Sequence, residues 1–218
     1  MLRKDLVTVF VCVDIQESER PKPIEQSALP PEWVEMGFTA DDVNAANAYA
    51  YDVALPNAVR AAEACRKAGF PLIFIHWGYL FEDGMDLDPE IYQAMRRNHG
   101  EDPSRWSGHI AQPGSQPARA LGIQPGEYVL PKSGQNAFLS CNLDFLLRNL
   151  GAQQLIMVGG HTGACYGKTA RTALDRGYHV IALVDATSDA RESSRAKCLE
   201  EIPFDGRMRT QEFLDALR

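Results

Sequence analysis

Short apolar runs alternate with amphipathic segments along most of this chain, and this alternation constrains the fold more than any other feature. The runs are rich in β-branched residues and are bounded by charged residues, glycine or proline, which predicts strands. The segments between them have apolar residues at helical spacing, and several end at a glycine. Strands are expected at residues 6–13, 71–77, 127–131, 153–160 and 179–186, and helices at residues 55–70, 139–151, 164–178 and 209–218.

Regular alternation of strands with helices is typical of a parallel sheet, because neighbouring parallel strands need a long crossover that is usually a helix. A near-continuous apolar strand such as residues 6–13 also indicates burial on both faces of the sheet. We therefore predict an α/β fold, a three-layer α/β/α sandwich with a mostly parallel, doubly wound central sheet. Functional side chains in such folds gather where the strands end.

The 218 residues fit one domain of this kind, spanning residues 1–218. Two stretches depart from the regular pattern, at about residues 17–55 and 78–124. The first is polar and proline-rich and then alanine-rich, with Thr39 as a plausible helix N-cap, and the second is rich in proline and charge. We expect the second stretch to form long loops with short helices, of the kind that cover an active site.

The composition argues against polyanionic and membrane partners. The chain has 22 Lys and Arg against 29 Asp and Glu, a formal charge of −7, and no basic stripe. We therefore expect no nucleic-acid partner and no membrane partner. No apolar stretch approaches the roughly 18 residues of a membrane span. Asp5 and Asp14 bound the first apolar run, which favours a strand over a signal peptide.

The cysteine usage indicates a reducing compartment. The chain has an odd number of cysteines, and none of them belongs to a CxxC pair: Cys12, Cys65, Cys141, Cys165 and Cys198. Free thiols of this kind favour the cytoplasm over a disulfide framework or a zinc ribbon. We therefore expect a cytoplasmic protein.

The stretch VGGHTGACYGKTA, at residues 158–170, indicates a strand, a glycine-rich turn and the start of a helix. One interpretation is a phosphate-binding P-loop, because GKT stands near a helix start. That motif requires G-x-x-x-x-G-K-[ST], and Thr162 occupies the position of the first glycine. Counting from Gly163 instead leaves the loop one residue short.

A second interpretation is a nucleotide-binding α/β protein that uses the Gly159–Gly167 turn. Glycines at 160, 163 and 167 follow a strand, and Asp185 stands near the distance at which a ribose-binding acid is expected. A dinucleotide-binding unit usually begins the sheet, however, whereas this turn lies near the end of the chain. Glycine-rich turns from strand to helix are also common in α/β folds.

A third interpretation is a nucleophile turn that presents Cys165. A thiol at a helix N-terminus lies beside unpaired N–H groups that favour a thiolate and can bind an oxyanion. A cysteine in such a place is otherwise a small buried residue. Asp14 and Lys132 also stand at the ends of expected strands, although each could be an ordinary turn or surface residue. In a parallel sheet these three strand ends converge on one crevice.

Three separated motifs resemble the isochorismatase-like cysteine hydrolases: VDIQ, LPKSGQNAF and VGGHTGACYGKTARTALDRGYHVIALVDA. The resemblance implies a catalytic triad of Asp14, Lys132 and Cys165. It also implies an oxyanion hole from the backbone N–H groups of His161, Ala164 and Cys165, and a cis peptide at Gly160–His161. The resemblance further implies a dimer or tetramer, so we expect a homo-oligomer.

The implied activity is hydrolysis of a C–N bond in a small amide, carbamoyl or ureido compound through a thioester on Cys165. In that mechanism Asp14 takes the thiol proton, while Lys132 and the helix N-terminus hold the thiolate. The same fold with a catalytically altered site is an alternative, although the intact triad residues argue against it.

We expect no metal and no other cofactor. The metal-dependent branch of the family carries Asp-x-His and a second histidine after the second strand, whereas His76 has no second histidine near it. Aromatic and amide side chains near the strand ends suit a small planar substrate. The substrate-binding candidates are Gln16, Trp77, Tyr79, Asn136, Phe138, His161 and Tyr166, with Trp106 and His109 as further possibilities.

Overall fold

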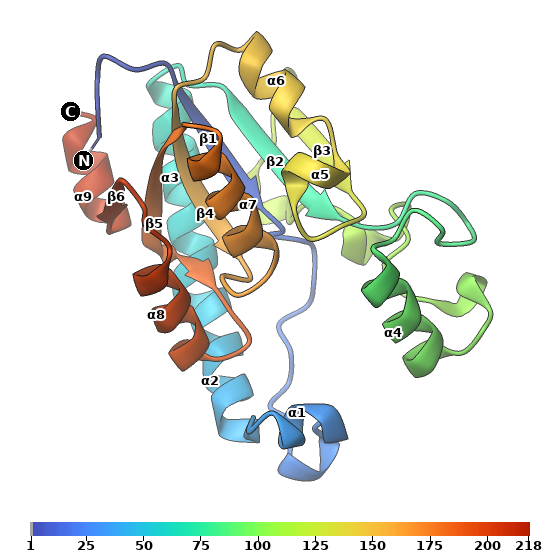
Figure 1. Ribbon diagram of the computed structural model, residues 1–218. Coiled ribbons are helices and arrows are strands. Elements are labelled where there is room, and N and C mark those ends of the chain that lie inside the picture. The colour runs from blue at the N-terminus through green and yellow to red at the C-terminus, as the bar shows by residue number, and fades with distance from the viewer. Residues whose placement is uncertain (1) are drawn as a thin grey trace.

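The computed structural model describes residues 2–218, and within them six parallel strands form one central sheet (Figure 1). Along the sheet the strands follow the order β3-β2-β1-β4-β5-β6. Their bounds are Thr8–Val13 for β1, Leu72–Trp77 for β2, Tyr128–Lys132 for β3, Gln154–Gly160 for β4, His179–Ser188 for β5 and Gly206–Met208 for β6. The order reverses between β1 and β4, so the crevice expected of a doubly wound sheet lies at the carboxyl ends of these two strands.

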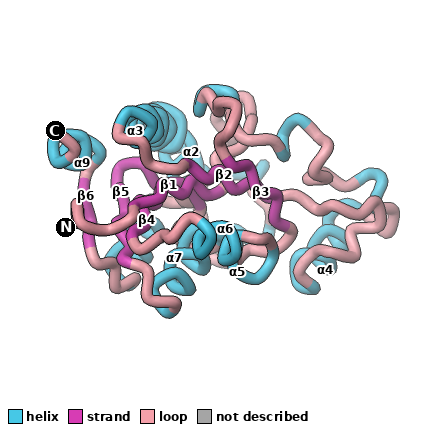
Figure 2. Tube along the Cα trace, turned by 90° about the horizontal axis from the view of Figure 1, so that it is seen from above, coloured by secondary structure: helices cyan, strands magenta, loops and turns pink. Residues whose placement is uncertain are grey.

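Helices cover both faces of the sheet, which confirms the predicted three-layer α/β/α fold (Figure 2). The helices are α1 at Pro31–Glu35, α2 at Ala40–Tyr49, α3 at Leu55–Lys67, α4 at Pro89–His99, α5 at Ala137–Ser140, α6 at Leu143–Asn149, α7 at Cys165–Asp175, α8 at Glu192–Glu201 and α9 at Thr210–Ala216. Helices α3 and α9 pack on one face, and α5 to α8 pack on the other. Among residues 2–218, no helix has the length and apolar character needed to cross a membrane.

Each central strand supplies side chains to two hydrophobic cores. In β1, the valines at 9, 11 and 13 face the core beneath α5 to α8, whereas Phe10 and Cys12 face the core beneath α3 and α9. Successive side chains of a strand point to opposite faces, so a strand buried on both faces needs apolar residues throughout. This requirement explains why residues 6–13 lack a polar alternation.

The two irregular stretches contain more structure than loops. Thr39 caps α2 with a reciprocal bond to Asp42, so α2 begins where a cap is expected. A short π-helix at Ala50–Ala54 then joins α2 to α3. Within residues 78–124, α4 stands apart from the sheet beyond β3, and short helical turns complete the segment (Figure 1).

Three details of the sheet and helices differ from the expectation. The single helix expected at residues 139–151 is two helices, because Cys141 adopts an extended backbone between α5 and α6. Residues 187–208 carry no expected element, yet they contain α8 and β6. Helix α8 has only one buried residue, Leu199, and β6 has three residues, so neither leaves a clear periodic pattern in the sequence.

Candidate active site

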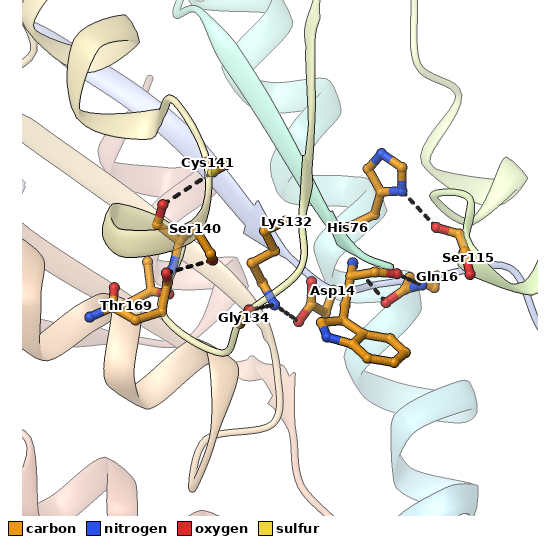
Figure 3. Close-up of polar contacts among 12 residues, drawn as sticks. Asp14, Gln16, His76, Ser115, Lys132, Gly134, Ser140, Cys141 and Thr169 are labelled. Carbon is orange, nitrogen blue, oxygen red and sulfur yellow. Dashed lines mark hydrogen bonds and ion pairs between the residues drawn. The ribbon is translucent and has the colours of Figure 1, made fainter. Parts of the chain in front are cut away.

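Three strand ends bring Asp14, Lys132 and Cys165 together at the carboxyl edge of the sheet. Asp14 directly follows β1, Lys132 is the last residue of β3, and Cys165 begins α7 after β4. Strand β2 lies between β1 and β3, so the long side chain of Lys132 extends past the end of β2. Its Nζ atom lies 2.7 Å from Oδ2 of Asp14 (Figure 3).

The Lys132–Asp14 ion pair is buried. The Lys132 side chain is 0% exposed and that of Asp14 is 9% exposed. A buried ammonium needs acceptors, and Lys132 Nζ also donates to the carbonyl of Gly134 at 3.0 Å (Figure 3). Oδ1 of Asp14 is buried without a conventional hydrogen bond in the described chain, and the same carboxyl interacts with the thiol of Cys165. One oxygen of Asp14 is therefore held by Lys132, and the other remains available for a proton.

The site favours a neutral thiol in the free protein. Burial, and then the neighbouring charge of Asp14, raise the pKa of Cys165 to about 12, and Lys132 only partly opposes them. Burial likewise raises the pKa of the Asp14 carboxyl above its usual range, against the opposing effect of Lys132. Lys132 and the helix N-terminus act in the opposite direction, toward the thiolate that the resemblance implies, and that thiolate stays a prediction. Asp14 is the acceptor adjacent to the thiol proton.

Glycines let the turn between β4 and α7 pack against its neighbours. Gly159 has a φ of +117°, and a Cβ atom there would lie 1.9 Å from the carbonyl oxygen of Val13. A Cβ atom at Gly167 would lie 2.0 Å from the carbonyl oxygen of Thr162. Any side chain at either position would collide with backbone. The peptide bond between Gly160 and His161 is cis, as the resemblance implies.

Asp189, which follows β5, fixes the far side of this turn. One of its carboxylate oxygens accepts from Thr162 Oγ1 and from the N–H of Gly163, both at 2.6 Å. This residue is absent from the sequence-based candidates. The available signal was an acidic residue directly after the strand that neighbours β4, but it is a weak one, because such aspartates are common in turns.

The backbone N–H groups of the turn differ in their availability. The N–H of Ala164 donates to the carbonyl of His161 at 3.0 Å. Among the described residues, the N–H groups of His161 and Cys165 donate to no acceptor. Cys165 is the first residue of α7, where an intrahelical acceptor is lacking in any helix. Of the three expected oxyanion donors, two are thus free and Ala164 is engaged.

A cavity of about 220 Å³ opens at this constellation. It is lined by Asp14, Gln16, Trp77, Gly160, His161, Ala164 and Cys165. The expected substrate-binding residues Gln16, Trp77 and His161 therefore lie together at the cavity. The Gln16 amide exchanges hydrogen bonds with the backbone of Trp77, donating at 2.9 Å and accepting at 3.1 Å (Figure 3). Gln16 thus ties the end of β1 to the end of β2.

Tyr79 does not line the cavity, contrary to expectation. Its side chain is 2% exposed, and its hydroxyl donates to the carbonyls of Pro103 and Trp106. Trp106 is equally buried and packs edge-on against Tyr79, and His109 also packs edge-on with that ring. Tyr79 and Trp106 belong to a small separate hydrophobic core, in which aromatic rings pack against each other.

Asn136, Phe138 and Tyr166 also lie outside the cavity lining. Asn136 caps α5 and donates to Thr172 Oγ1 at 2.8 Å. Phe138 packs against Tyr178 in the core beneath α5 to α8, and Tyr166 is fully buried in the same core. A side chain committed to a core or a helix cap is not free to bind substrate, so the structure does not bring these three to the cavity.

The residues on which the P-loop and the nucleotide-binding interpretations depend form other structural contacts. Gly167, Lys168 and Thr169 lie inside α7 rather than in a loop, and Thr169 is buried with its hydroxyl accepting from the N–H of Ala137. The Asp185 carboxylate accepts from the backbone and hydroxyl of Thr210 at 2.8 and 2.7 Å. Neither a phosphate cradle nor a free ribose-binding acid is formed.

His76 has a structural partner. Its Nδ1 atom lies 2.6 Å from the carbonyl oxygen of Ser115, and its ring is 4% exposed (Figure 3). The described part of the chain contains no group of three or more His, Cys, Asp or Glu side chains placed to hold a metal ion.

The fold agrees with what the family comparison gives. The model of the isochorismatase domain matches residues 8–210, so the chain belongs to the isochorismatase family of hydrolases. An uncharacterized isochorismatase family protein of Bacillus subtilis is 29% identical over 167 residues, which cover 75% of this chain and 83% of that protein.

Two further similarities bear on the relatives' activities and the fold. A ureidoacrylate amidohydrolase of Pseudomonas syringae is 28% identical over 142 residues, covering 62% of this chain and 58% of that protein. This chain therefore matches less than two thirds of that relative's length. The crystal structure of N-carbamoylsarcosine amidase from Thermoplasma acidophilum has the same fold, with a TM-score of 0.62 at 21% identity over 93% of this chain and 96% of that chain.

The turn can be tested by two alanine substitutions. Gly167→Ala should lower the free energy of unfolding by about 1–3 kcal/mol, because the new Cβ meets backbone. Gly163→Ala is the matched control, since its nearest neighbour would be a side-chain oxygen at 3.3 Å rather than backbone, and its effect should be clearly smaller. Urea unfolding measures both, and equal stability of the two variants would contradict this account.

The electrostatic relation between Asp14 and Cys165 predicts how the reactivity of the thiol depends on pH. In Asp14→Asn the charge that raises the pKa of Cys165 is gone, so the pKa of the thiol should fall and the pH profile of its alkylation by iodoacetamide should shift to lower pH. Peptide mass spectrometry measures the rate. Asp175→Asn, an exposed change on the same helix, should leave it unaltered. An alkylation profile shifted to higher pH in Asp14→Asn would refute the assignment.

Proposed function

We propose that this protein is a cysteine hydrolase that cleaves a C–N bond of a small amide, carbamoyl or ureido compound through a thioester on Cys165. The observation that carries the proposal is the buried Lys132–Asp14 ion pair set against the thiol of Cys165 at a small cavity. The similarity to a protein named ureidoacrylate amidohydrolase supports the same bond type.

Acylation begins with transfer of the Cys165 proton to Oδ1 of Asp14 as Sγ attacks the substrate carbonyl carbon. The carbonyl oxygen becomes an oxyanion, and the N–H groups of Cys165 and His161 donate to it. Loss of one such donor typically costs about 3 kcal/mol of transition-state stabilisation. The intermediate collapses when the C–N bond breaks, and the proton on Asp14 passes to the leaving nitrogen. Ammonia or an amine departs, and the acyl group stays on Cys165.

Hydrolysis of the thioester reverses the proton path. Asp14 accepts a proton from water while the water oxygen attacks the thioester carbon. The same N–H groups hold the second oxyanion. When the C–S bond breaks, the proton on Asp14 returns to the sulfur of Cys165, and the acid product leaves. Asp14 therefore acts as base and then acid in both halves of the reaction.

Lys132 acts through Asp14 in this scheme. An isolated carboxyl group buried to this degree would stay protonated, so it could not accept the proton of the thiol. The ammonium at 2.7 Å opposes that effect and holds the carboxylate in place for the thiol. We place the protein in the cytoplasm, because its five cysteines are free thiols and the mechanism needs one of them reduced.

An ammonia-release screen over carbamoyl, ureido and simple amide compounds tests the proposal. Cys165→Ala should lower kcat on the best compound by at least about a thousandfold, since the nucleophile is lost. Cys198→Ala is the matched control, as Cys198 is exposed to a similar degree, and its kcat should stay within about twofold. Activity that survives in Cys165→Ala would overturn the mechanism, and a wild-type protein inert toward every compound would favour the catalytically altered scaffold.

A further inference from the structure

A second cavity, of about 240 Å³, adjoins the catalytic cavity at the carboxyl edge of the sheet. Asp14 and Gln16, which Figure 3 shows at the site, line both cavities. The two cavities also meet along β4, because Gly159 lines the second cavity and Gly160 lines the catalytic one. The two spaces are therefore neighbours around the end of β1.

The walls of the second cavity contain many small apolar side chains. Five alanines line it beside Leu55: Ala50, Ala54, Ala118, Ala120 and Ala186. We call this cavity the alanine pocket. Side chains this short leave room between the walls, and an apolar cavity of about 150 Å³ is enough to bind benzene. The alanine pocket is thus large enough for a propyl or a benzyl group and offers it apolar contacts.

Several polar side chains of the alanine pocket already have partners within the protein. The Glu17 carboxylate accepts from the backbone N–H of Arg119 at 2.7 Å. The Tyr51 hydroxyl donates to the carbonyl of Glu19 at 3.0 Å and contacts the Ser18 hydroxyl. Glu17 and Arg119 both line the pocket, so their opposite charges offset each other. This part of the pocket therefore does not favour an ionic group over a neutral one.

One wall of the pocket comes from the irregular stretch at residues 17–55. The π-helix at Ala50–Ala54 supplies Ala50, Tyr51 and Ala54 to the lining. Single π-helical turns are rare and occur frequently at functional sites. An ion pair of 2.6 Å between Arg20 and Asp52 joins the chain that follows β1 to this turn. The irregular stretch thus forms part of a cavity that reaches the catalytic aspartate.

The position of Asp14 determines which part of a substrate would enter the alanine pocket. Of the catalytic triad, Cys165 lines the catalytic cavity, Lys132 lines neither cavity, and Asp14 lines both. In the proposed mechanism the carbonyl carbon is bonded to the sulfur of Cys165. The leaving nitrogen takes its proton from Asp14 and so lies within hydrogen-bond reach of that carboxyl group. A substituent on this nitrogen therefore begins beside Asp14, next to the alanine pocket.

We propose that the alanine pocket binds an apolar substituent on the leaving amine. The substrate class is then an N-substituted amide, R–CO–NH–R′, in which R′ is a small alkyl or arylalkyl group. The sulfur of Cys165 bonds to the carbonyl carbon, the C–N bond breaks, and the proton that Asp14 took from the thiol leaves on R′NH2. This inference rests on the proposed hydrolase function and adds a specificity site to it.

Four amides test which side of the bond the pocket serves: acetamide, N-propylacetamide, N-benzylacetamide and phenylacetamide. Benzylamine and ammonia are nearly equal in basicity, so acetamide and N-benzylacetamide differ mainly in what the protein can bind. Chromatography of the released amine or ammonia gives kcat/KM. Wild type should prefer N-benzylacetamide to acetamide by at least about tenfold, because the pocket buries its ring. A preference for phenylacetamide over N-benzylacetamide would place the apolar group on the acyl side and overturn the proposal.

Substitutions that fill the pocket test its location. Ala50→Leu should lower the ratio of kcat/KM for N-benzylacetamide over acetamide by at least about tenfold, and Ala120→Leu fills the pocket from another element. Ala48→Leu is the matched control, because Ala48 is half-buried like Ala50 but lies outside the lining, and its ratio should stay within about twofold of wild type. A lower ratio in either filling variant, with the unfolding temperature of wild type, supports the pocket. An unchanged ratio in both overturns it.

A binding measurement separates failure of the pocket from failure of the reaction. Titrations followed by ligand NMR compare N-benzylacetamide with acetamide on Cys165→Ala, and on Cys165→Ala combined with Ala50→Leu. Binding of the benzyl compound that is at least about tenfold tighter, and that the second substitution weakens to the level of acetamide, supports the pocket. If wild type then hydrolyses none of the four amides, that result counts against the proposed reaction alone. Equal binding of the two amides, or a preference that Ala50→Leu leaves unaltered, overturns the pocket.

Discussion

The buried ion pair between Lys132 and Asp14 is the interaction on which the rest of the site depends. Taking two charges out of water costs several kcal/mol per ion, and only close geometry with further hydrogen bonds offsets that cost. Here the pair is 2.7 Å apart and Gly134 supplies a further acceptor. The fold holds these groups because β1 and β3 end on the same edge of a parallel sheet, one strand apart. Breaking such a pair from one side typically costs about 3–5 kcal/mol.

The ion pair also sets how the thiol is used. Burial and the carboxylate beside Cys165 raise the pKa of the thiol, whereas Lys132 acts in the opposite direction. The same carboxylate is the group that receives the proton once a carbonyl lies within reach of Sγ. The turn from Gly159 to Cys165 completes the arrangement, because its glycines let the backbone approach Val13 and Asp189 fixes its far side.

The sequence predicts the positions of Asp14, Lys132 and Cys165 because each follows or ends a strand, and parallel strands end on one edge whatever the loops do. The fold is also predictable from the sequence, because the periodicities of strands and helices are local signals. Gln16, Trp77 and His161 reach the cavity for that reason too. The break at Cys141 and the short strand β6 depend on tertiary packing, which periodicity does not record.

The aromatic candidates show where sequence reasoning ends. Tyr79 follows the end of β2 and Tyr166 lies at the start of α7. A large ring at either position buries as much area in a core as in a pocket, and only packing decides between the two. The role of Asp189 is not predicted from the sequence for a related reason. Its hydrogen-bond partners Thr162 and Gly163 are 27 and 26 residues away in sequence. Contacts at that distance become visible only when β4 and β5 are placed side by side.

Rapid acid quenching followed by mass spectrometry of the peptide that contains Cys165 tests the central claim most directly. With a turned-over carbamoyl, ureido or amide compound, the account predicts an adduct on Cys165 whose mass equals the substrate minus its leaving amine. The adduct should form and decay at rates compatible with kcat, and hydroxylamine should remove it. Turnover that proceeds at full rate with no adduct on Cys165, or with the adduct on another cysteine, would contradict the account.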